Sequence, residues 1–197
     1  MLPDTFNEQM TAVIQQVRRS LVQLTNGQMG SGAGTIWHAD GLILTNAHVV
    51  QRHAPQVVLA DGRAFSSRLL ATDETLDLAA LAIEAHDLPT VELGSSRSLR
   101  AGDWVIAVGH PWGVVGVASA GTVIDVGVPV ELPRYPGDLI QVGLQLRPGH
   151  SGGPMVDGNG RLVGINTMIA GPQVGLAIPL HTVKQFLRDR LGHANKN

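Results

Sequence analysis

Short apolar segments with a period of two residues dominate the chain from Ser20 onward. They are separated by Asn-Gly, Asp-Gly and other turn signals, and glycine supplies 24 of the 197 residues. Such short alternating segments predict half-buried strands, and the turn residues between them predict tight reversals of the chain. We expect six strands in the first half to form one antiparallel barrel, at residues 21–24, 34–37, 42–44, 56–59, 65–70 and 78–83.

The second half repeats this pattern after a stretch rich in small and polar residues. Residues 94–102 are rich in glycine and serine and have the composition of a linker, so they mark the boundary between two barrels. The later apolar segments are 104–108, 117–126, 139–146, 155–156, 162–169 and 174–178. The sequence therefore predicts an all-β protein of two six-stranded antiparallel barrels, with residues 20–95 in the first and 96–180 in the second.

Helical spacing appears only near the two ends of the sequence. Apolar residues recur every three or four positions between residues 5 and 19, at Phe6, Met10, Val13, Ile14 and Val17. We expect an N-terminal helix within residues 1–19, with its apolar stripe packed either on the main body or against another subunit. A second helix is predicted within residues 181–197, because an amphipathic stretch that begins at Leu180 is followed by Gly192, which is expected to cap it.

Composition excludes several classes of protein. The chain is 44% hydrophobic and 15% charged, which fits a globular protein with a good core, and its formal charge of −2 gives no reason to expect nucleic acid or anionic membrane as a partner. It has no cysteine, so disulfides, thiolate metal sites and a cysteine nucleophile are excluded. No apolar run approaches the length of a membrane span, and no signal peptide is recognisable, so we expect a soluble molecule.

The segment Gly149-His150-Ser151-Gly152-Gly153-Pro154 is the strongest chemical signal. Glycines on both sides of Ser151 allow a sharp turn and leave its hydroxyl uncrowded. The amides of Gly149 and Ser151 could converge on a developing oxyanion. Because a serine hydroxyl is a weak nucleophile at neutral pH, this interpretation requires a base and a group that orients the base.

Two upstream segments supply those groups. His48 follows the apolar segment 42–44, and Asp77 is embedded in the apolar run 76–81. Asp73 is the weaker candidate because it lies in a polar run typical of a solvated turn. The order His48, Asp77, Ser151 is that of chymotrypsin, and it differs from the order in subtilisin and the α/β-hydrolases.

These motifs resemble those of the HtrA/Deg family of trypsin-like serine proteases. The matching segments occur in the family's order and cover most of residues 20–185: GSGAGTIW (30–37), TNAHVV (45–50), DLAAL (77–81), VGHPWG (108–113), LIQVGLQLRPGHSGGP (139–154), LVGINT (162–167) and GLAIP (175–179). The resemblance implies a serine endopeptidase that hydrolyses unfolded or misfolded proteins. A catalytically weak, chaperone-like or scaffolding module that only binds peptides is the alternative.

The resemblance also implies roles for particular residues. Leu146 and Ala177 would line the primary specificity pocket, and Thr167, Met168 and Ile169 would form the strand that pairs with the substrate backbone. Such a pocket has no acidic floor, so we expect cleavage after small or medium aliphatic residues.

The resemblance bears on assembly and location as well. The N-terminal segment would build a homotrimer, as in related proteases. The family usually continues into PDZ domains, and we expect none within these residues. An extracytoplasmic location would follow if a signal segment had been removed, and a cytoplasmic one otherwise.

His150 departs from the family, which usually has asparagine before the nucleophile. Its imidazole either replaces asparagine as a local hydrogen-bonding group or makes the oxyanion loop sensitive to pH. The remaining histidines are expected to be structural or exposed because none shows a metal-ligand spacing: His38, His53, His86, His110, His181 and His193. We therefore expect neither a metal nor a cofactor. Residues 126–138 contain three prolines and predict either an exposed sensor loop or an ordinary surface excursion.

Overall fold

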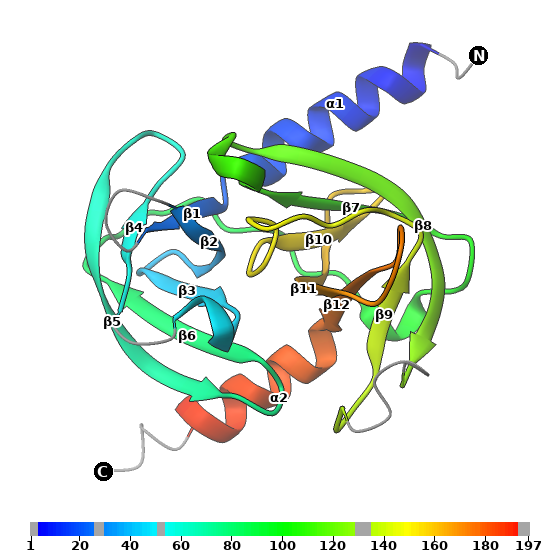
Figure 1. Ribbon diagram of the computed structural model, residues 1–197. Coiled ribbons are helices and arrows are strands. Elements are labelled where there is room, and N and C mark those ends of the chain that lie inside the picture. The colour runs from blue at the N-terminus through cyan, green and yellow to red at the C-terminus, as the bar shows by residue number, and fades with distance from the viewer. Residues whose placement is uncertain (1–3, 26–29, 51–53, 129–134, 193–197) are drawn as a thin grey trace.

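The computed structural model describes residues 4–25, 30–50, 54–128 and 135–192. They form two closed antiparallel β-barrels side by side, with one helix before the first barrel and one after the second (Figure 1). This confirms the predicted fold class. The division of the chain into domains at residues 1–19, 20–95, 96–180 and 181–197 stays a prediction.

The first barrel contains β1 to β6. Its circuit of hydrogen-bonded neighbours reads β1-β2-β3-β6-β5-β4, and β4 closes on β1. Its interior is filled by aliphatic side chains such as Val22, Ile36 and Leu81, all of which are buried. The strands are β1 (Leu21–Thr25), β2 (Gly30–His38), β3 (Leu42–Thr45), β4 (Gln56–Val58), β5 (Ala64–Asp73) and β6 (Leu78–Ile83).

The second barrel repeats the topology of the first. Its circuit reads β10-β11-β12-β9-β8-β7, which is the same cyclic order once the six strands are numbered along the chain. The strands are β7 (Trp104–Gly109), β8 (Val117–Gly127), β9 (Leu139–Val142), β10 (Pro154–Asp157), β11 (Leu162–Ile169) and β12 (Gly175–Pro179). The two halves of the chain therefore form barrels with the same strand order.

A shared core holds the two barrels together. Leu44 and Leu78 of the first barrel belong to the same buried cluster as Val108 and Ile165 of the second. This contact fixes the relative position of the barrels, because burying aliphatic side chains stabilises the interface and close packing resists sliding.

The helix α1 (Asp4–Arg18) packs on the second barrel. Val17 is fully buried, Phe6 meets the ring of Trp104 edge-on at 6.2 Å, and the Nε of Arg18 donates to the carbonyl oxygen of Gly116 at 2.6 Å. The N-terminal end of α1 extends beyond the barrels in Figure 1. The apolar stripe of this helix therefore packs at least partly on its own main body.

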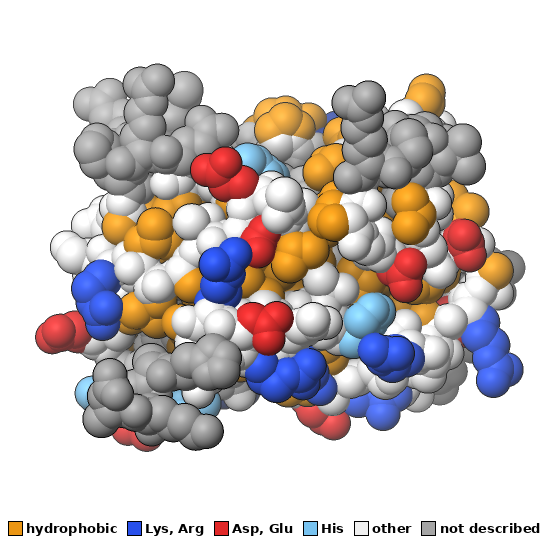
Figure 2. Space-filling model, turned by 90° about the horizontal axis from the view of Figure 1, so that it is seen from below, with side chains coloured by type: hydrophobic (Ala, Val, Ile, Leu, Met, Phe, Trp, Pro, Cys, Tyr) orange, Lys and Arg blue, Asp and Glu red, His pale blue; other side chains and the backbone are white. Residues whose placement is uncertain are grey.

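The helix α2 (Leu180–Leu191) lies across the underside of both barrels in Figure 1. Phe186 is buried against the shared core, and the guanidinium of Arg190 reaches Asp73 at 2.9 Å. Gly192 ends the helix and donates its amide to the carbonyl oxygens of Leu187 and Arg188, as the sequence predicts. Figure 2 shows the face of the molecule that contains α2, where charged side chains of both signs are interspersed.

Part of the predicted sensor loop lies outside the described residues, namely 129–134. Tyr135, at its end, is half-buried and donates its hydroxyl to the carbonyl oxygen of Leu76 at 3.1 Å. Neither helix of the described chain has the length and apolar content that a membrane span requires.

Candidate active site

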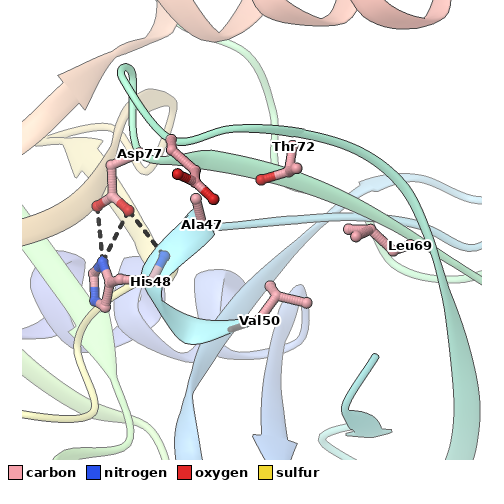
Figure 3. Close-up of a pocket in the computed structure, with 7 residues that line it drawn as sticks. Ala47, His48, Val50, Leu69, Thr72 and Asp77 are labelled. Atoms are coloured by element: carbon pink, nitrogen blue, oxygen red, sulfur yellow. Dashed lines mark hydrogen bonds and ion pairs between the residues drawn. The ribbon is translucent and has the colours of Figure 1, made fainter. Parts of the chain in front are cut away.

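An imidazole and a carboxylate meet at the edge of the first barrel (Figure 3). The Nδ1 of His48 lies 2.9 Å from Asp77 Oδ1 and 2.8 Å from Oδ2. The backbone amide of His48 also donates to Asp77 Oδ1 at 3.0 Å. The carboxylate therefore fixes both the ring and the backbone of His48 and leaves Nε2 directed away from Asp77.

Local backbone structure brings this pair together. His48 lies in a single 3₁₀ turn, Ala47–Val49, directly after β3, while Asp77 precedes β6, which pairs with β3. Asp77 has a φ of 56°, an unusual value for a residue other than glycine, and its carbonyl oxygen accepts the Asn46 side-chain amide at 2.9 Å. The Asn46 amide thus supports a strained backbone at a residue whose side chain contacts His48.

The second barrel adds a further donor to Asp77. The hydroxyl of Thr167 on β11 donates to Asp77 Oδ2 at 2.6 Å. Burial alone would raise the pKa of Asp77, but the hydrogen bonds from His48 and Thr167 outweigh it and hold that pKa below its ordinary value. Asp77 is therefore a stable carboxylate at neutral pH.

Ser151 lies in a turn between β9 and β10 that is anchored on both barrels. Its carbonyl oxygen accepts the amide of Ala33 on β2 at 2.9 Å, and the next amide, of Gly152, donates to Asn166 on β11 at 2.9 Å. Gly152 has a φ of 84°, and any side chain there would collide with the backbone of Ala33. Only glycine fits this position, which explains the first glycine after Ser151.

His48 and Ser151 line the same cavity, of about 330 Å³, between the barrels. In this structure the Ser151 hydroxyl donates to the carbonyl oxygen of Thr167 at 2.8 Å. Among the described residues no hydrogen bond joins Ser151 to His48. A rotation of the Ser151 side chain is therefore needed before its oxygen can donate to the imidazole.

Two backbone amides beside Ser151 are left without acceptors. Within the described parts of the chain, neither the Gly149 nor the Ser151 amide donates to any protein group. Gly149 has a φ of 104°, and its carbonyl oxygen accepts the His110 amide at 2.8 Å, which holds the loop in place. Free amides in a pocket are suited to bind a negatively charged oxygen.

The structure brings most of the predicted substrate-binding residues to this cavity. Leu146 forms one wall, and Thr167, Met168 and Ile169 form another. Ala177 does not line the cavity: it is fully buried on β12, in the same apolar cluster as Leu146. Any influence of Ala177 on the pocket would therefore act through the packing of Leu146.

His110, for which the sequence predicts a structural or exposed role, lies in the same region. It is 6% exposed, and its Nδ1 accepts the amide of Gly116 at 3.3 Å. Burial lowers its pKa to about 4, with a further contribution from His150. The signal that could have placed it here is its position in the segment VGHPWG, directly after the buried strand β7.

His150 is 1% exposed, and its Nδ1 lies 3.2 Å from both the amide nitrogen and the carbonyl oxygen of Arg147. Burial lowers its pKa below the ordinary value. The Nε2 atoms of both His110 and His150 are buried without a hydrogen-bond partner in the described structure. Two neutral imidazoles are therefore enclosed in the region of Gly149 and Ser151.

A second cavity, of about 410 Å³, also has His48 in its wall (Figure 3). It is lined by Ala47, His48, Val50, Leu69, Thr72, Glu74 and Asp77. No cluster of three or more potential metal ligands occurs in the described ranges of the chain.

Comparison with known proteins agrees with this geometry. Residues 32–165 match the model of the trypsin-like peptidase domain family. The chain is 36% identical over 181 residues to the putative serine protease HhoB of Synechocystis sp., with 84% of this chain and 42% of the relative covered. It is 40% identical over 163 residues to the putative serine protease HhoA of the same organism, with 79% and 41% covered. The chain thus spans about two fifths of the length of these relatives.

Solved structures of HtrA-type proteases have the same fold. AlgW in complex with a tripeptide superimposes with a TM-score of 0.86 at 32% identity, over 94% of this chain and 64% of that one. AlgW with a decapeptide gives the same TM-score at 27% identity, with 93% and 68% covered. The matched family model covers more than half of the residues, and the relatives reported above are serine proteases. The chain therefore belongs to the trypsin-like peptidase family, and the solved structures that it resembles are HtrA-type proteases.

Proposed function

We propose that the protein is a serine endopeptidase in which Ser151 is the nucleophile, His48 the general base and Asp77 the residue that orients His48. The observation that carries this proposal is one cavity containing the Ser151 hydroxyl, an imidazole held by a buried carboxylate, and two unpaired amides. These are the groups that acyl transfer requires.

The reaction follows from these positions. Ser151 Oγ turns from the Thr167 carbonyl towards His48 and attacks the carbonyl carbon of the scissile bond while Nε2 takes its proton. The amides of Gly149 and Ser151 bind the resulting oxyanion, each contributing about 3 kcal/mol. The carbon–nitrogen bond then breaks, and His48 gives its proton to the leaving amine. Water, deprotonated by His48, hydrolyses the acyl-enzyme and restores Ser151.

Asp77 acts through His48. Its bond to Nδ1 selects the tautomer with a free Nε2 and stabilises the imidazolium that forms during the reaction. Since hydrogen bonds keep Asp77 ionised, the carboxylate does not need to accept the proton itself.

The cavity beside Ser151 favours small or medium aliphatic residues at the cleavage site. Leu146, Met168 and Ile169 supply apolar walls, and no carboxylate is among the described residues that line it. The Thr167–Ile169 strand segment would pair with an extended substrate backbone, which gives little side-chain discrimination. Unfolded or misfolded polypeptides are the substrates that can adopt this conformation.

A homotrimer built through the N-terminal segment is a further proposal. The N-terminal half of α1 is largely exposed and extends beyond the barrels, which leaves it available for a neighbouring subunit. Light scattering coupled to gel filtration should give three times the chain mass, and removal of residues 1–9 should reduce it to the monomer mass. A monomer for the full chain would contradict the proposal.

The proposed activity is tested by β-casein digestion, by peptide turnover and by covalent labelling with a fluorophosphonate. All three are expected for the wild type and lost in Ser151→Ala. A weak chaperone-like module would instead bind unfolded casein without cleaving it and would not be labelled. The Ser151→Ala protein should keep the wild-type melting temperature, which shows that the fold is intact.

A further inference from the structure

Three carboxylates lie within five positions at the loop between β5 and β6, and two of them have partners. Asp73 binds the guanidinium of Arg190 and the hydroxyl of Thr75, and Asp77 binds His48 and Thr167. Glu74 is exposed and makes no hydrogen bond or ion pair with any described residue. Its carboxylate lines the cavity of about 410 Å³ beside His48.

Half of the other residues that line this cavity are aliphatic. Ala47, Val50 and Leu69 form its apolar walls, and Leu69 is 42% exposed although it is a large hydrophobic residue. No lysine or arginine is among the described lining residues. An aliphatic wall with a single free carboxylate suits a long side chain that has an apolar stem and a cationic head, as in lysine and arginine.

The position of the cavity relates it to the substrate. His48 is part of the wall of both this cavity and the one that contains Ser151 and Leu146. Successive side chains of an extended chain point to opposite sides. When one substrate side chain enters the Leu146 pocket, the side chain of the residue before it must point away from that pocket, and the cavity that shares His48 is the adjoining space that can receive it.

We propose that the cavity formed by Ala47, Val50, Leu69 and Glu74 binds a lysine or arginine side chain of the substrate, and that Glu74 selects it. The occupied residue is the one that directly precedes the residue in the Leu146 pocket. This inference rests on the proposed peptidase function and adds a second specificity determinant to it. Glu74 acts on substrate binding and takes no part in proton transfer.

The expected preference for a cationic side chain is modest, because the Glu74 carboxylate remains partly in water. A partly exposed ion pair is worth up to about 1 kcal/mol, which corresponds to roughly a fivefold change in kcat/KM. Screening by salt should reduce this preference as ionic strength rises from 0.05 to about 1 M.

The test uses fluorogenic peptides that end in valine linked to aminocoumarin, so that only residues before the cleaved bond are present. The residue before valine is lysine, acetyl-lysine or glutamate. Acetyl-lysine keeps the aliphatic stem and removes the charge. Wild-type protein should cleave the lysine peptide about fivefold better than the acetyl-lysine peptide, Glu74→Gln should abolish the difference, and Glu74→Lys should favour glutamate.

Glu84→Gln is the matched control, since Glu84 is also exposed and the substitution changes the net charge equally without touching the cavity. It should keep the wild-type preference. Equal cleavage of the lysine and acetyl-lysine peptides by the wild type, or a preference that survives in Glu74→Gln, would overturn the inference while leaving the peptidase function intact.

If no peptide is cleaved, binding measurements test the role of Glu74 separately from the proposed peptidase function. The same peptides, labelled for fluorescence anisotropy, are titrated into Ser151→Ala protein. Ser151→Ala protein should bind the lysine peptide more tightly than the acetyl-lysine peptide. If the double variant Ser151→Ala/Glu74→Gln loses this difference, the inference is supported even without turnover. Equal affinities for lysine and acetyl-lysine peptides refute it.

Discussion

The Thr167 hydroxyl of the second barrel donates a 2.6 Å hydrogen bond to the Asp77 carboxylate of the first. Together with the bond from His48 it gives Asp77 two side-chain donors, one from each barrel. The orientation of the carboxylate, and through it of the imidazole, thus depends on how the barrels are joined.

Replacing Thr167 with valine should lower kcat more than it raises KM. A hydrogen bond to a charged group is worth about 1.5–3 kcal/mol, so kcat/KM should fall roughly 10- to 100-fold. Steady-state kinetics on a fluorogenic peptide measure the effect. Thr167→Ser keeps the hydroxyl and should recover most of the activity; equal losses in both variants would show that the methyl group, and not the donor, matters.

Gly149→Ala should abolish most activity. Gly149 has a φ of 104°, and an added side chain would collide with the backbone of His110, so the amide at this position would be displaced from the oxyanion site. Loss of one oxyanion donor costs a factor of about 10² to 10³ in kcat.

Gly62→Ala provides the matched control for that variant. Gly62 has a similar φ of 88°, but nothing lies within 4 Å of an added methyl group. Both substitutions should cost about 1–2 kcal/mol of stability through backbone strain, with a further cost for Gly149→Ala from the collision with His110, yet only Gly149→Ala should lose turnover and fluorophosphonate labelling. Similar kinetics in the two variants would contradict the role of the Gly149 amide.

Acid should destabilise the fold through His110. Its folded-state pKa of about 4 lies below the ordinary value of 6.5, so the unfolded chain binds the proton more readily. Stability from this group is fully present above pH 6.5 and is lost as pH falls from 6.5 towards 4, by at most about 3 kcal/mol. Urea unfolding at several pH values should show a weaker pH dependence for His110→Asn than for the wild type.

The exposed His86 offers a comparison for the stability measurement. His86→Asn should leave the pH dependence of unfolding as it is in the wild type. The assignment to His110 fails if both asparagine variants change the pH dependence equally.

Protonation of His150 should lower the activity at acid pH. Its imidazole is buried between Arg147 and His110, and its Nε2 has no partner in the described structure, so a charge there would disturb the loop that carries Gly149 and Ser151. Protonation of His150 should therefore steepen the fall of log kcat/KM as pH decreases. His150→Asn should make that fall shallower, and an unchanged slope would refute the effect.

The sequence was sufficient for the fold class because its signals are local. Alternating segments bounded by turns, such as 42–44 and 78–83, identify strands, and the Gly192 cap identifies the end of α2. The pairing of His48 with Asp77 was also predicted, from the apolar segment beside each residue and from the order of His48, Asp77 and Ser151 along the chain. In the structure the two residues flank the neighbouring strands β3 and β6. Local pattern and chain order were enough for these conclusions.

Other features depend on long-range contacts that no local pattern encodes. The donor Ala33 and the acceptor Ser151 are far apart in the sequence, and only closure of both barrels brings them to 2.9 Å. The same packing turns the Ser151 hydroxyl towards Thr167, buries Ala177 behind Leu146, and encloses His110 with His150.

By itself, the sequence of this protein determined the two barrels, the terminal helices and the residue types available for chemistry, because periodicity, turns and motif order are properties of neighbouring positions. Only the tertiary structure decided which amides remain unpaired, which imidazoles are buried, and that Glu74 is left without a described partner beside His48. Burial and pairing depend on which distant segments pack together, and that is settled when the barrels close and dock.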